Sequence, residues 1–589
     1  MTTAARPVDD TLVNLALIAI GVAGAAAALL RGAAALTAWV SRTGQPTADW
    51  ASGIRVLGDP ADPGRAFGAD ISPLAYWTVL AVLVATLLAT GFLAWRKVDS
   101  LRHKTRHDPR RLVGVATRTD VATVASKKAL LARSTTLRPS LTSARASDVG
   151  YLLGRSRGME VWASVEDSIL LLGPPRSGKG LHVVINAILD APGAVVTTAT
   201  RPDNIAATIT ARQKVGPVAV FDPQRLAEGL PSGLRWSPVR GCEDPLTAMI
   251  RATGLASATG LSSGGVESGG FWEGKTRSAL QALLHAAALD HRSPAELFAW
   301  TLSPSSASDA VAILASHPSA AAGWDESLDS MIHSDARTRD SIWMGVSLAL
   351  SCLADPRVLD AVTPRPGEHF DPVEFLTGNG TLYLLATGAG AGASWSLVAA
   401  FIEDLVETAR RLAAASAGAR LDPPLLLALD EIGNLSPLPS LPVLMAEGGG
   451  TGITTMPVLQ SLSQVRDKWG DHAAGAIWDA SIAKIILGGT SSARDLQDLS
   501  ALIGERDEKT DTISVGDYGS RSLQRSTRRV PILPPEAIRT LPFGTALVLL
   551  RSSSPLVTDL RPWTARTDAT IVRSSRNQTE GMLRNHAAR

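Results

Sequence analysis

The chain has 589 residues, enough for a membrane segment and more than one folded domain. Its formal net charge is +2, so no global basic field announces a nucleic-acid-binding protein, although a local basic surface is compatible with that total. The two cysteines, Cys242 and Cys352, lie far apart and in no metal-ligand spacing, which excludes a disulfide framework and favours two buried thiols in a cytosol-facing protein.

Two uncharged apolar runs near the N-terminus, residues 12–30 and 74–95, are long enough to cross a bilayer. Tyr76 and Trp95 lie near the ends of the second run, where aromatic rings favour the membrane interface. A signal peptide is the alternative for the first run, which is longer than a typical signal sequence. A buried helical hairpin is the alternative for both runs. We expect a membrane anchor over residues 1–100 with two transmembrane helices.

A segment rich in Lys and Arg follows the second run, and residues 101–149 are expected to form a basic cytoplasmic linker. An excess of positive charge beside a span predicts that this side faces the cytoplasm. Residues 31–73 then form a short external loop. The prediction is a multi-pass protein of the plasma membrane whose remaining chain lies in the cytoplasm. The basic segment also suits binding to anionic lipid or DNA.

A compact apolar run, "SILLL", leads directly into "GPPRSGKG" and then into a stretch with helical spacing. Strand, Gly-rich loop and helix in this order predict a phosphate-binding loop. Backbone N–H groups cradle phosphates in such a loop, the helix N-terminus adds its dipole, and Lys179 reaches the outer phosphates. The position after the lysine, where the pattern has Ser or Thr for magnesium, is Gly180. The residues expected to bind nucleotide are Gly173, Pro174, Pro175, Arg176, Ser177, Gly178, Lys179 and Gly180.

Two later apolar runs end in polar residues suited to the same chemistry. The run 425–429 ends in Asp430 and Glu431, and the run 453–459 ends in Gln460. A carboxylate at the carboxyl end of a parallel strand holds magnesium, here Asp430, and an adjacent one, here Glu431, polarises the attacking water. A glutamine on the next strand senses the terminal phosphate. We expect Lys179, Asp430, Glu431 and Gln460 to be the catalytic residues.

The order of these elements predicts an α/β fold, a RecA-like nucleoside-triphosphatase core with an inserted all-α domain after two transmembrane helices. About two hundred residues separate "VFDP" from the acidic strand, too many for one crossover, and much of this stretch has helical spacing. Phe271 and Trp272 in the insertion suit either core packing or contact with nucleotide. The expected domains are the nucleotide-binding domain in two parts, 150–243 and 365–566, the insertion 244–364, and a disordered tail, 567–589.

Several motifs together resemble the type IV coupling proteins, the TraG/TraD-like ATPases of conjugation. They are "GYLLGR" at 150–155, "GPPRSGKG", "ALDEIGNL", "LQSLSQVRDKWG" at 459–470 and the closing segment 530–550, behind two membrane spans. "TTATRPDNI" and "VAVFDPQ" resemble an actinobacterial branch. In this family Gly after the loop lysine is frequent, which implies that phosphates, water and the acidic pair hold Mg²⁺; such sparse protein ligation suits this ion.

The resemblance implies a membrane-anchored homohexamer that uses ATP and Mg²⁺ to move single-stranded DNA, or a DNA–protein complex, into a type IV secretion channel. It implies relaxase and relaxosome proteins as partners, met by the all-α domain. Related ring ATPases place an arginine between the acidic and glutamine strands, where this chain has three glycines, Gly448–Gly450. Arg466 and Arg494 are the candidates for an arginine acting on the neighbouring subunit, and a surface role is equally compatible with either.

Two other functions fit the same motifs. An FtsK-like translocase of double-stranded DNA is one, although such proteins usually bring more spans and a C-terminal winged helix. A cargo-docking platform that uses nucleotide as an assembly switch is the other. ATPase assays separate the three functions. Stimulation of hydrolysis by single-stranded DNA supports the coupling protein, stimulation by duplex alone supports the FtsK-like translocase, and no hydrolysis supports the docking platform.

Overall fold

The computed structural model describes residues 10–49, 52–106, 108–230, 233–262, 268–388, 393–435, 437–515 and 521–587. The chain forms two compact units, Met1–Asp108 and Pro109–Arg589. Each unit has its own hydrophobic core.

The first unit consists of two long helices and a small connecting segment. Its helices are α1 (Asp10–Val40), α2 (Ser52–Arg55), α3 (Pro63–Phe67) and α4 (Pro73–Arg106). Phe67, Leu30 and Tyr76 are buried together, and the Tyr76 hydroxyl donates to the Leu30 carbonyl at 3.2 Å. This small core holds the two long helices together at one end.

Both long helices carry a stretch long and apolar enough to cross a membrane, Ala19–Val40 in α1 and Pro73–Lys97 in α4. The second matches the expected run. The first lies further along the chain than predicted, because α1 continues through Arg31, whose guanidinium donates to the carbonyl groups of Ala48 and Asp49. The expected loop over residues 31–73 is therefore shorter than predicted and carries two short helices.

The second unit is built on an 11-stranded sheet with the order β2-β1-β13-β12-β9-β3-β8-β7-β4-β6-β5. The strands are β1 (Gly150–Ser156), β2 (Met159–Ser164), β3 (Ile169–Leu172), β4 (Val195–Ala199), β5 (Val218–Phe221), β6 (Thr381–Leu385), β7 (Leu425–Leu429), β8 (Ile453–Leu459), β9 (Ala483–Leu487), β12 (Thr545–Leu550) and β13 (Leu556–Leu560). The strands from β9 to β5 pair in parallel, and β12, β13, β1 and β2 extend the sheet in antiparallel pairs.

The central strands are apolar on both sides because both faces of the sheet are covered. In β3, Leu170 and Leu172 pack into one core while Ile169 and Leu171 pack into the other. Continuous apolar runs of this kind are typical of buried parallel strands. The runs that predicted β7 and β8 coincide with the strands observed.

Residues 109–149 are folded onto the sheet, so the prediction of a linker is wrong for most of that segment. Short helices occupy it: η1 (Pro109–Arg111), α5 (Arg118–Val124), α6 (Lys127–Leu131), α7 (Ser134–Leu137) and α8 (Ala146–Val149). Val121, Leu130 and Leu137 are buried in the same core as Leu171. The sequence analysis noted the basic residues of this segment but not the buried apolar residues that α5, α6, α7 and α8 each contain.

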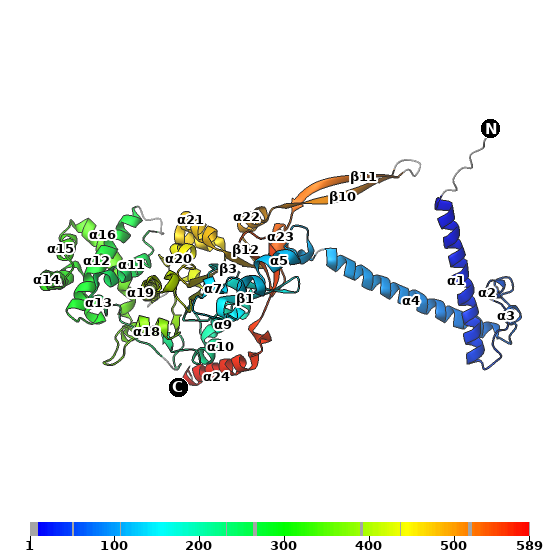
Figure 1. Cartoon of the computed structure of the whole chain (residues 1–589), viewed down its shortest axis with the longest axis horizontal. Helices are drawn as coiled ribbons and strands as arrows, with labels where there is room; N and C mark the ends of the chain where they lie inside the picture. The colour runs from blue at the N-terminus through cyan, green and yellow to red at the C-terminus, as the bar shows by residue number, and fades with distance from the viewer. Residues whose placement is uncertain are drawn as a thin grey trace. The chain divides into compact units, whose positions relative to one another are not determined.

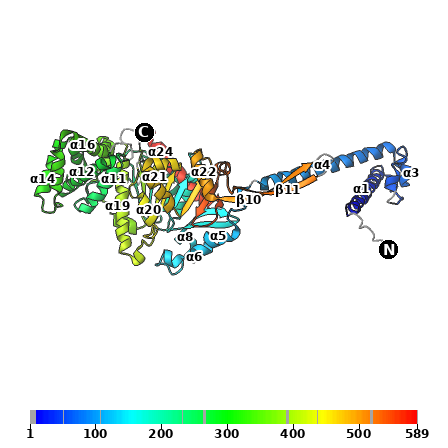
Figure 2. The same cartoon turned by 90° about the horizontal axis from the view of Figure 1, so that it is seen from above.

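The inserted segment is helical, and its helices gather at one end of the unit (Figures 1 and 2). They are α11 (Pro245–Ser257), α12 (Gly269–Leu289), α13 (Pro294–Leu302), α14 (Ser308–Ser316), α15 (Trp324–Ile332), α16 (Ala336–Leu350), α17 (Pro356–Ala361) and α18 (Pro372–Thr377), followed after β6 by α19 (Trp395–Ala414). Trp272 is partly buried against the core, whereas Phe271 is 55% exposed, so core packing holds for the tryptophan only.

The remaining helices of the unit are η2 (Gly180–Val184), α9 (Ile185–Asp190), α10 (Asp203–Arg212), α20 (Leu441–Glu447), α21 (Leu462–Ala480), α22 (Ala493–Ile503), α23 (Pro535–Arg539) and α24 (Ala569–Ala587). An antiparallel pair, β10 (Glu505–Val515) and β11 (Arg521–Pro531), projects as a separate ribbon, which the sequence did not predict (Figure 1). The expected disordered tail is instead α24. Its buried row includes Val572, Ser575 and Thr579, and small polar side chains gave no apolar period to recognise.

Candidate nucleotide site

The Gly-rich loop joins the buried strand β3 to the helical turn η2, as the sequence predicts. Gly178 has φ +88°, and a Cβ there would lie 2.7 Å from the His182 ring and 2.9 Å from Phe543. A Cβ on Gly173 would lie 2.6 Å from the Ser177 hydroxyl. Both glycines are therefore required for this tight path of the chain. Arg176 also adopts a positive φ, of 62°.

The Lys179 ammonium is folded back onto its own loop. Its Nζ donates to the carbonyl groups of Gly173 at 2.6 Å and Pro174 at 3.1 Å. Burial lowers the pKa of Lys179, and the nearby Asp430 and Glu431 carboxylates oppose that shift. A phosphate group is a stronger acceptor than two neutral carbonyls, so the ammonium is placed to exchange these contacts for an anion.

The acidic pair lies directly after β7, the strand that supplies the central apolar run. Glu431 has φ +54°, and its backbone N–H donates to Asp430 Oδ1 at 3.0 Å. Burial raises the pKa of Asp430 to about 6; a hydrogen bond from Asn204 and the charge of Lys179 act against this rise, and the charge of Glu431 adds to it. The Asp430 carboxylate thus lies in a low-dielectric environment, where a bound cation would stabilise its ionised form.

Two polar residues that the sequence did not single out hold the acidic pair. Thr200, just after β4, donates from its hydroxyl to the Glu431 carboxylate. Asn204, in the first turn of α10, donates from Nδ2 to Asp430 Oδ2 at 3.0 Å. Their position after β4 could have identified them as site residues. Strand β4 pairs in parallel with β7, so the carboxyl ends of the two strands meet at one edge of the sheet.

Gln460 follows β8 and is joined to the segment after β7 through Asn434. Gln460 Nε2 and Gln464 Nε2 donate to Asn434 Oδ1 at 3.2 and 2.9 Å. Gln464 Oε1 also accepts the backbone N–H of Gln460 at 3.0 Å. The glutamine therefore has a fixed neighbour rather than a free surface position.

A cavity of about 780 Å³ brings these groups together. It is lined by Pro175, Arg176, Ser177, Gly178, Lys179, Gly180, Leu181, Ile185, Ala199, Thr200, Arg201, Asp203, Asn204, Asp430, Glu431, Asn434, Gln460, Trp563 and Arg576. Gly173 does not line it, and Pro174 lines a neighbouring cavity beside Phe543. Trp563 and Arg576 come from the C-terminal segment, which the sequence analysis placed outside the site or in a disordered tail.

Arg466 and Arg494 do not line this cavity. Arg466 is paired with Asp495 at 2.9 Å, and Arg494 is 75% exposed, with Asp498 at 4.0 Å. Both line a separate cavity of about 470 Å³ between α21 and α22. Their proposed action on a neighbouring subunit remains a prediction.

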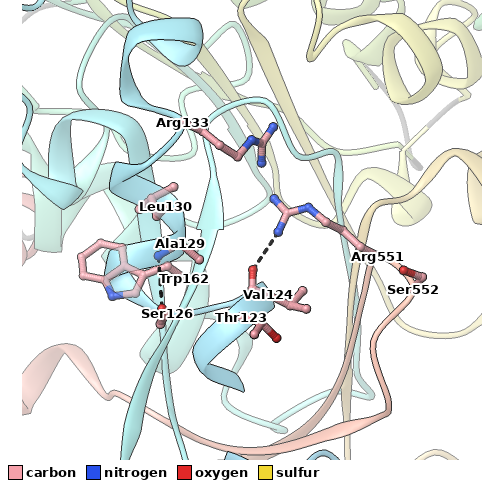
Figure 3. A pocket seen from close by; sticks show the side chains of 9 residues that line it. All are labelled: Thr123, Val124, Ser126, Ala129, Leu130, Arg133, Trp162, Arg551 and Ser552. Carbon is pink, nitrogen blue, oxygen red and sulfur yellow. Dashed lines mark hydrogen bonds between the residues drawn. The ribbon is translucent and has the colours of Figure 1, made fainter. Parts of the chain in front are cut away.

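Another cavity, of about 320 Å³, shares no lining residue with the nucleotide cavity (Figure 3). The Arg133 and Arg551 side chains point toward one another across it, and Trp162 lies on its other side (Figure 3). Arg551 donates to the Val124 carbonyl at 2.9 Å and to both oxygens of Asp167 at 2.9 and 2.8 Å. These contacts tie the folded segment after residue 109 to the turn that precedes β3.

Residues 424–543 match a family model described as the TraM recognition site of TraD and TraG. No curated protein sequence matches the chain. The fold is similar to that of the bacterial conjugative coupling protein TrwBdeltaN70 in an unbound form, with a TM-score of 0.51 and 18% identity, over 74% of this chain and 92% of that chain.

Two liganded structures of the plasmid coupling protein TrwB are similar to the same degree. One contains ADP and Mg²⁺, with a TM-score of 0.50 and 17% identity, and the other a non-hydrolysable ATP analogue, with a TM-score of 0.50 and 18% identity. Each covers 74% of this chain and 93% of that chain. The predicted fold class, a RecA-like core with an all-α insertion behind two long apolar helices, is confirmed. The chain thus shares the family model over residues 424–543 and the fold of a conjugative coupling protein.

Proposed function

We propose that the chain is a membrane-anchored ATPase that drives single-stranded DNA, or a DNA–protein complex, into a type IV secretion channel. The observation that carries this proposal is the convergence of Lys179, the Asp430–Glu431 pair and Gln460 on one cavity, although they are up to 281 residues apart (460 − 179). A lysine-bearing loop, an acidic pair and a glutamine are the parts that a phosphoryl-transfer motor needs.

The residues present fit ATP and Mg²⁺. The loop offers backbone N–H groups and Lys179 to the phosphates, and the buried Asp430 carboxylate is an oxygen donor of the kind that Mg²⁺ binds. In the described ranges, no group of three His, Cys, Asp or Glu side chains could hold a metal ion. When bound, Mg²⁺ neutralises charge on the phosphates.

Each residue has a role that its contacts support. Lys179 leaves the carbonyls of its own loop and grips the outer phosphates. Glu431, oriented by Thr200, accepts hydrogen bonds from the attacking water and takes its proton. Gln460, linked through Asn434 to the segment after Glu431, responds to loss of the terminal phosphate.

The finer features of the proposal extend beyond this cavity. The nucleotide-binding domain comprises 150–243 and 365–566, with 244–364 inserted, and the chain works as a homohexamer in which Arg466 or Arg494 acts on a neighbour's nucleotide. The two apolar helices anchor it as a multi-pass protein of the plasma membrane with the motor in the cytoplasm. Partners are relaxase and relaxosome proteins and channel components. The match of residues 424–543 to a TraM recognition site supports a relaxosome partner.

ATP hydrolysis by the full chain, measured with no DNA, single-stranded DNA and duplex DNA, tests the proposal. We expect stimulation by single-stranded DNA. Stimulation by duplex alone would support an FtsK-like translocase instead, and absence of hydrolysis in every oligomer would support a docking platform.

A further inference from the structure

The loop position that usually carries a hydroxyl has an oxygen beside it from another part of the chain. Position 180 is glycine, where the phosphate-loop pattern has Ser or Thr. Apart from its chain neighbours and its own helical turn, a Cβ built on Gly180 would have one neighbour within 4 Å, the side-chain oxygen of Asn204, at 3.8 Å. The amide oxygen of Asn204 therefore lies next to the position where the side chain of a loop Ser or Thr would begin.

Asn204 is held in this orientation by its other contact. Its side chain is 4% exposed, and Nδ2 donates to Asp430 Oδ2 at 3.0 Å. Turning the amide over would set its oxygen against a carboxylate, so the donor faces Asp430 and the acceptor faces away from it. Within the described part of the chain, Asn204 Oδ1 accepts no hydrogen bond, and the residue lines the nucleotide cavity with Gly180 and Asp430.

The other two hydroxyl groups near the loop are directed at other acceptors. Ser177 donates to the Pro174 carbonyl at 2.7 Å, and Thr200 donates to Glu431. An amide carbonyl is a hard oxygen donor and suits Mg²⁺. We propose that the Asn204 side-chain oxygen replaces the missing loop hydroxyl as a ligand of the nucleotide-bound Mg²⁺, next to Asp430. This inference rests on the proposed function, because it requires the cavity to bind ATP with Mg²⁺.

The substitution also explains why the loop tolerates glycine. A neutral amide from α10 supplies the oxygen that the loop lacks, while its N–H group holds the Asp430 carboxylate in place. One side chain thus performs two tasks that are separate when the loop carries its own hydroxyl. Loss of the Asn204 side chain should therefore lower the affinity for Mg²⁺ more than the affinity for the nucleotide.

Equilibrium binding of a fluorescent ATP analogue to the full chain tests this, first in EDTA and then with increasing Mg²⁺. The variants are Asn204→Ala, the double variant Asn204→Ala with Gly180→Ser, and the control Asn585→Ala. Asn585 is an exposed asparagine of α24 that does not line the nucleotide cavity. The serine has room, since the nearest atom to its Cβ would be the oxygen that the double variant removes.

We expect Asn204→Ala to bind the analogue in EDTA like the wild type but to need on the order of 10–100-fold more Mg²⁺ for the tight complex. Gly180→Ser should restore most of that loss, and Asn585→Ala should keep the wild-type magnesium dependence. Wild-type magnesium dependence in Asn204→Ala, or no recovery in the double variant, would overturn the inference. Failure of the wild type to bind the analogue under any condition would instead overturn the proposed function.

A second measurement does not depend on the folding of Asn204→Ala. In the full chain carrying ¹³C at the asparagine side-chain carbonyl and bound to Mn²⁺ and ADP, we expect a ¹³C hyperfine coupling by electron–nuclear double resonance. The Asn434→Ala background removes the other asparagine of the cavity from the signal. Absence of the coupling in that background would contradict ligation by Asn204.

Discussion

Gln460 Nε2 donates a hydrogen bond to Asn434 Oδ1 at 3.2 Å, and this contact links the end of β8 to the segment that follows Glu431. Because Asn434 and Gln460 follow the neighbouring parallel strands β7 and β8, a shift of Gln460 toward a phosphate would move the segment beside the acidic pair. We therefore predict that the glutamine acts in turnover rather than in binding.

Replacing Gln460 with Ala should lower kcat while leaving nucleotide affinity close to that of the wild type. Loss of one hydrogen-bonding group that acts in the transition state costs about 100-fold in rate. Steady-state ATP hydrolysis and equilibrium nucleotide binding measure the two quantities, with Gln497→Ala, an exposed site on α22, as the control. A weaker nucleotide complex with unchanged kcat would assign Gln460 to binding.

Acid should weaken the magnesium complex because the Asp430 pKa is raised to about 6 by burial. Below that pH the carboxyl binds a proton that Mg²⁺ must displace, so apparent magnesium affinity should fall by about tenfold for each further pH unit. Magnesium titrations of analogue binding between pH 5 and 8 check this slope, with binding in EDTA as the control. A flat profile would contradict the assignment of Asp430 to the metal.

The same pKa shift has the opposite consequence for stability without ligand. A folded-state pKa above the unfolded value means that the folded state favours the protonated carboxyl, so this group stabilises the fold most at low pH. That contribution is lost as pH rises through about 6. Asp430→Asn should therefore raise the melting temperature of the ligand-free chain at pH 7, and much less at pH 5. Equal increases in melting temperature at both pH values would show that the raised pKa of Asp430 is not the cause.

Arg576 of α24 lines the nucleotide cavity and should contribute to nucleotide affinity. It is half-exposed and bonded to Glu580 at 2.7 Å, so we expect only a loss of about 1 kcal/mol, a several-fold weaker complex, in Arg576→Ala. Arg584→Ala on the same helix is the matched control, because Arg584 is exposed and does not line the cavity. Calorimetric titration with nucleotide measures the affinity of both variants. Equal affinities would contradict a contribution of Arg576 to nucleotide binding.

The ion pair between Asp167 and Arg551 should stabilise the second unit. Asp167 is 2% exposed and also accepts the backbone N–H of Ser164 at 2.7 Å. Removing Arg551 leaves the buried Asp167 carboxylate without its counter-charge, so Arg551→Ala should cost about 3–5 kcal/mol of the unfolding free energy. Asp340→Ala, at an exposed pair, should cost less than about 1 kcal/mol. Denaturant unfolding of the full chain measures both, and similar values would contradict the role of this contact.

The sequence was sufficient for the elements whose signal is local. The strands β7 and β8 were predictable because each is a continuous apolar run that ends in a polar residue, and the loop around Lys179 follows a spacing that its backbone requires. The roles of Lys179, Asp430, Glu431 and Gln460 rest on the same local patterns and stay predictions.

Contacts between distant segments were beyond that reasoning. Thr200 and Asn204 belong to the site only because β4 lies beside β7. Helix α24 contributes Arg576 to the cavity, but it packs on α10 through small polar residues such as Ser575, which resemble a polar tail in the sequence. In the ribbon of β10 and β11, none of the residues whose burial is described, 505–510 and 523–531, is buried, so they give no apolar pattern. Helix α1 continued through Arg31 because that charge finds backbone carbonyls elsewhere in its unit.

The most direct test of the whole account is ATP binding and single-stranded-DNA-stimulated hydrolysis by Glu431→Gln, measured in the full chain in lipid nanodiscs beside the wild type and Lys179→Ala. The account predicts that Glu431→Gln binds ATP like the wild type and loses at least about 100-fold in turnover, since only the base is removed. Lys179→Ala should lose binding itself. Turnover close to wild type in Glu431→Gln, or unchanged ATP affinity in Lys179→Ala, would contradict it.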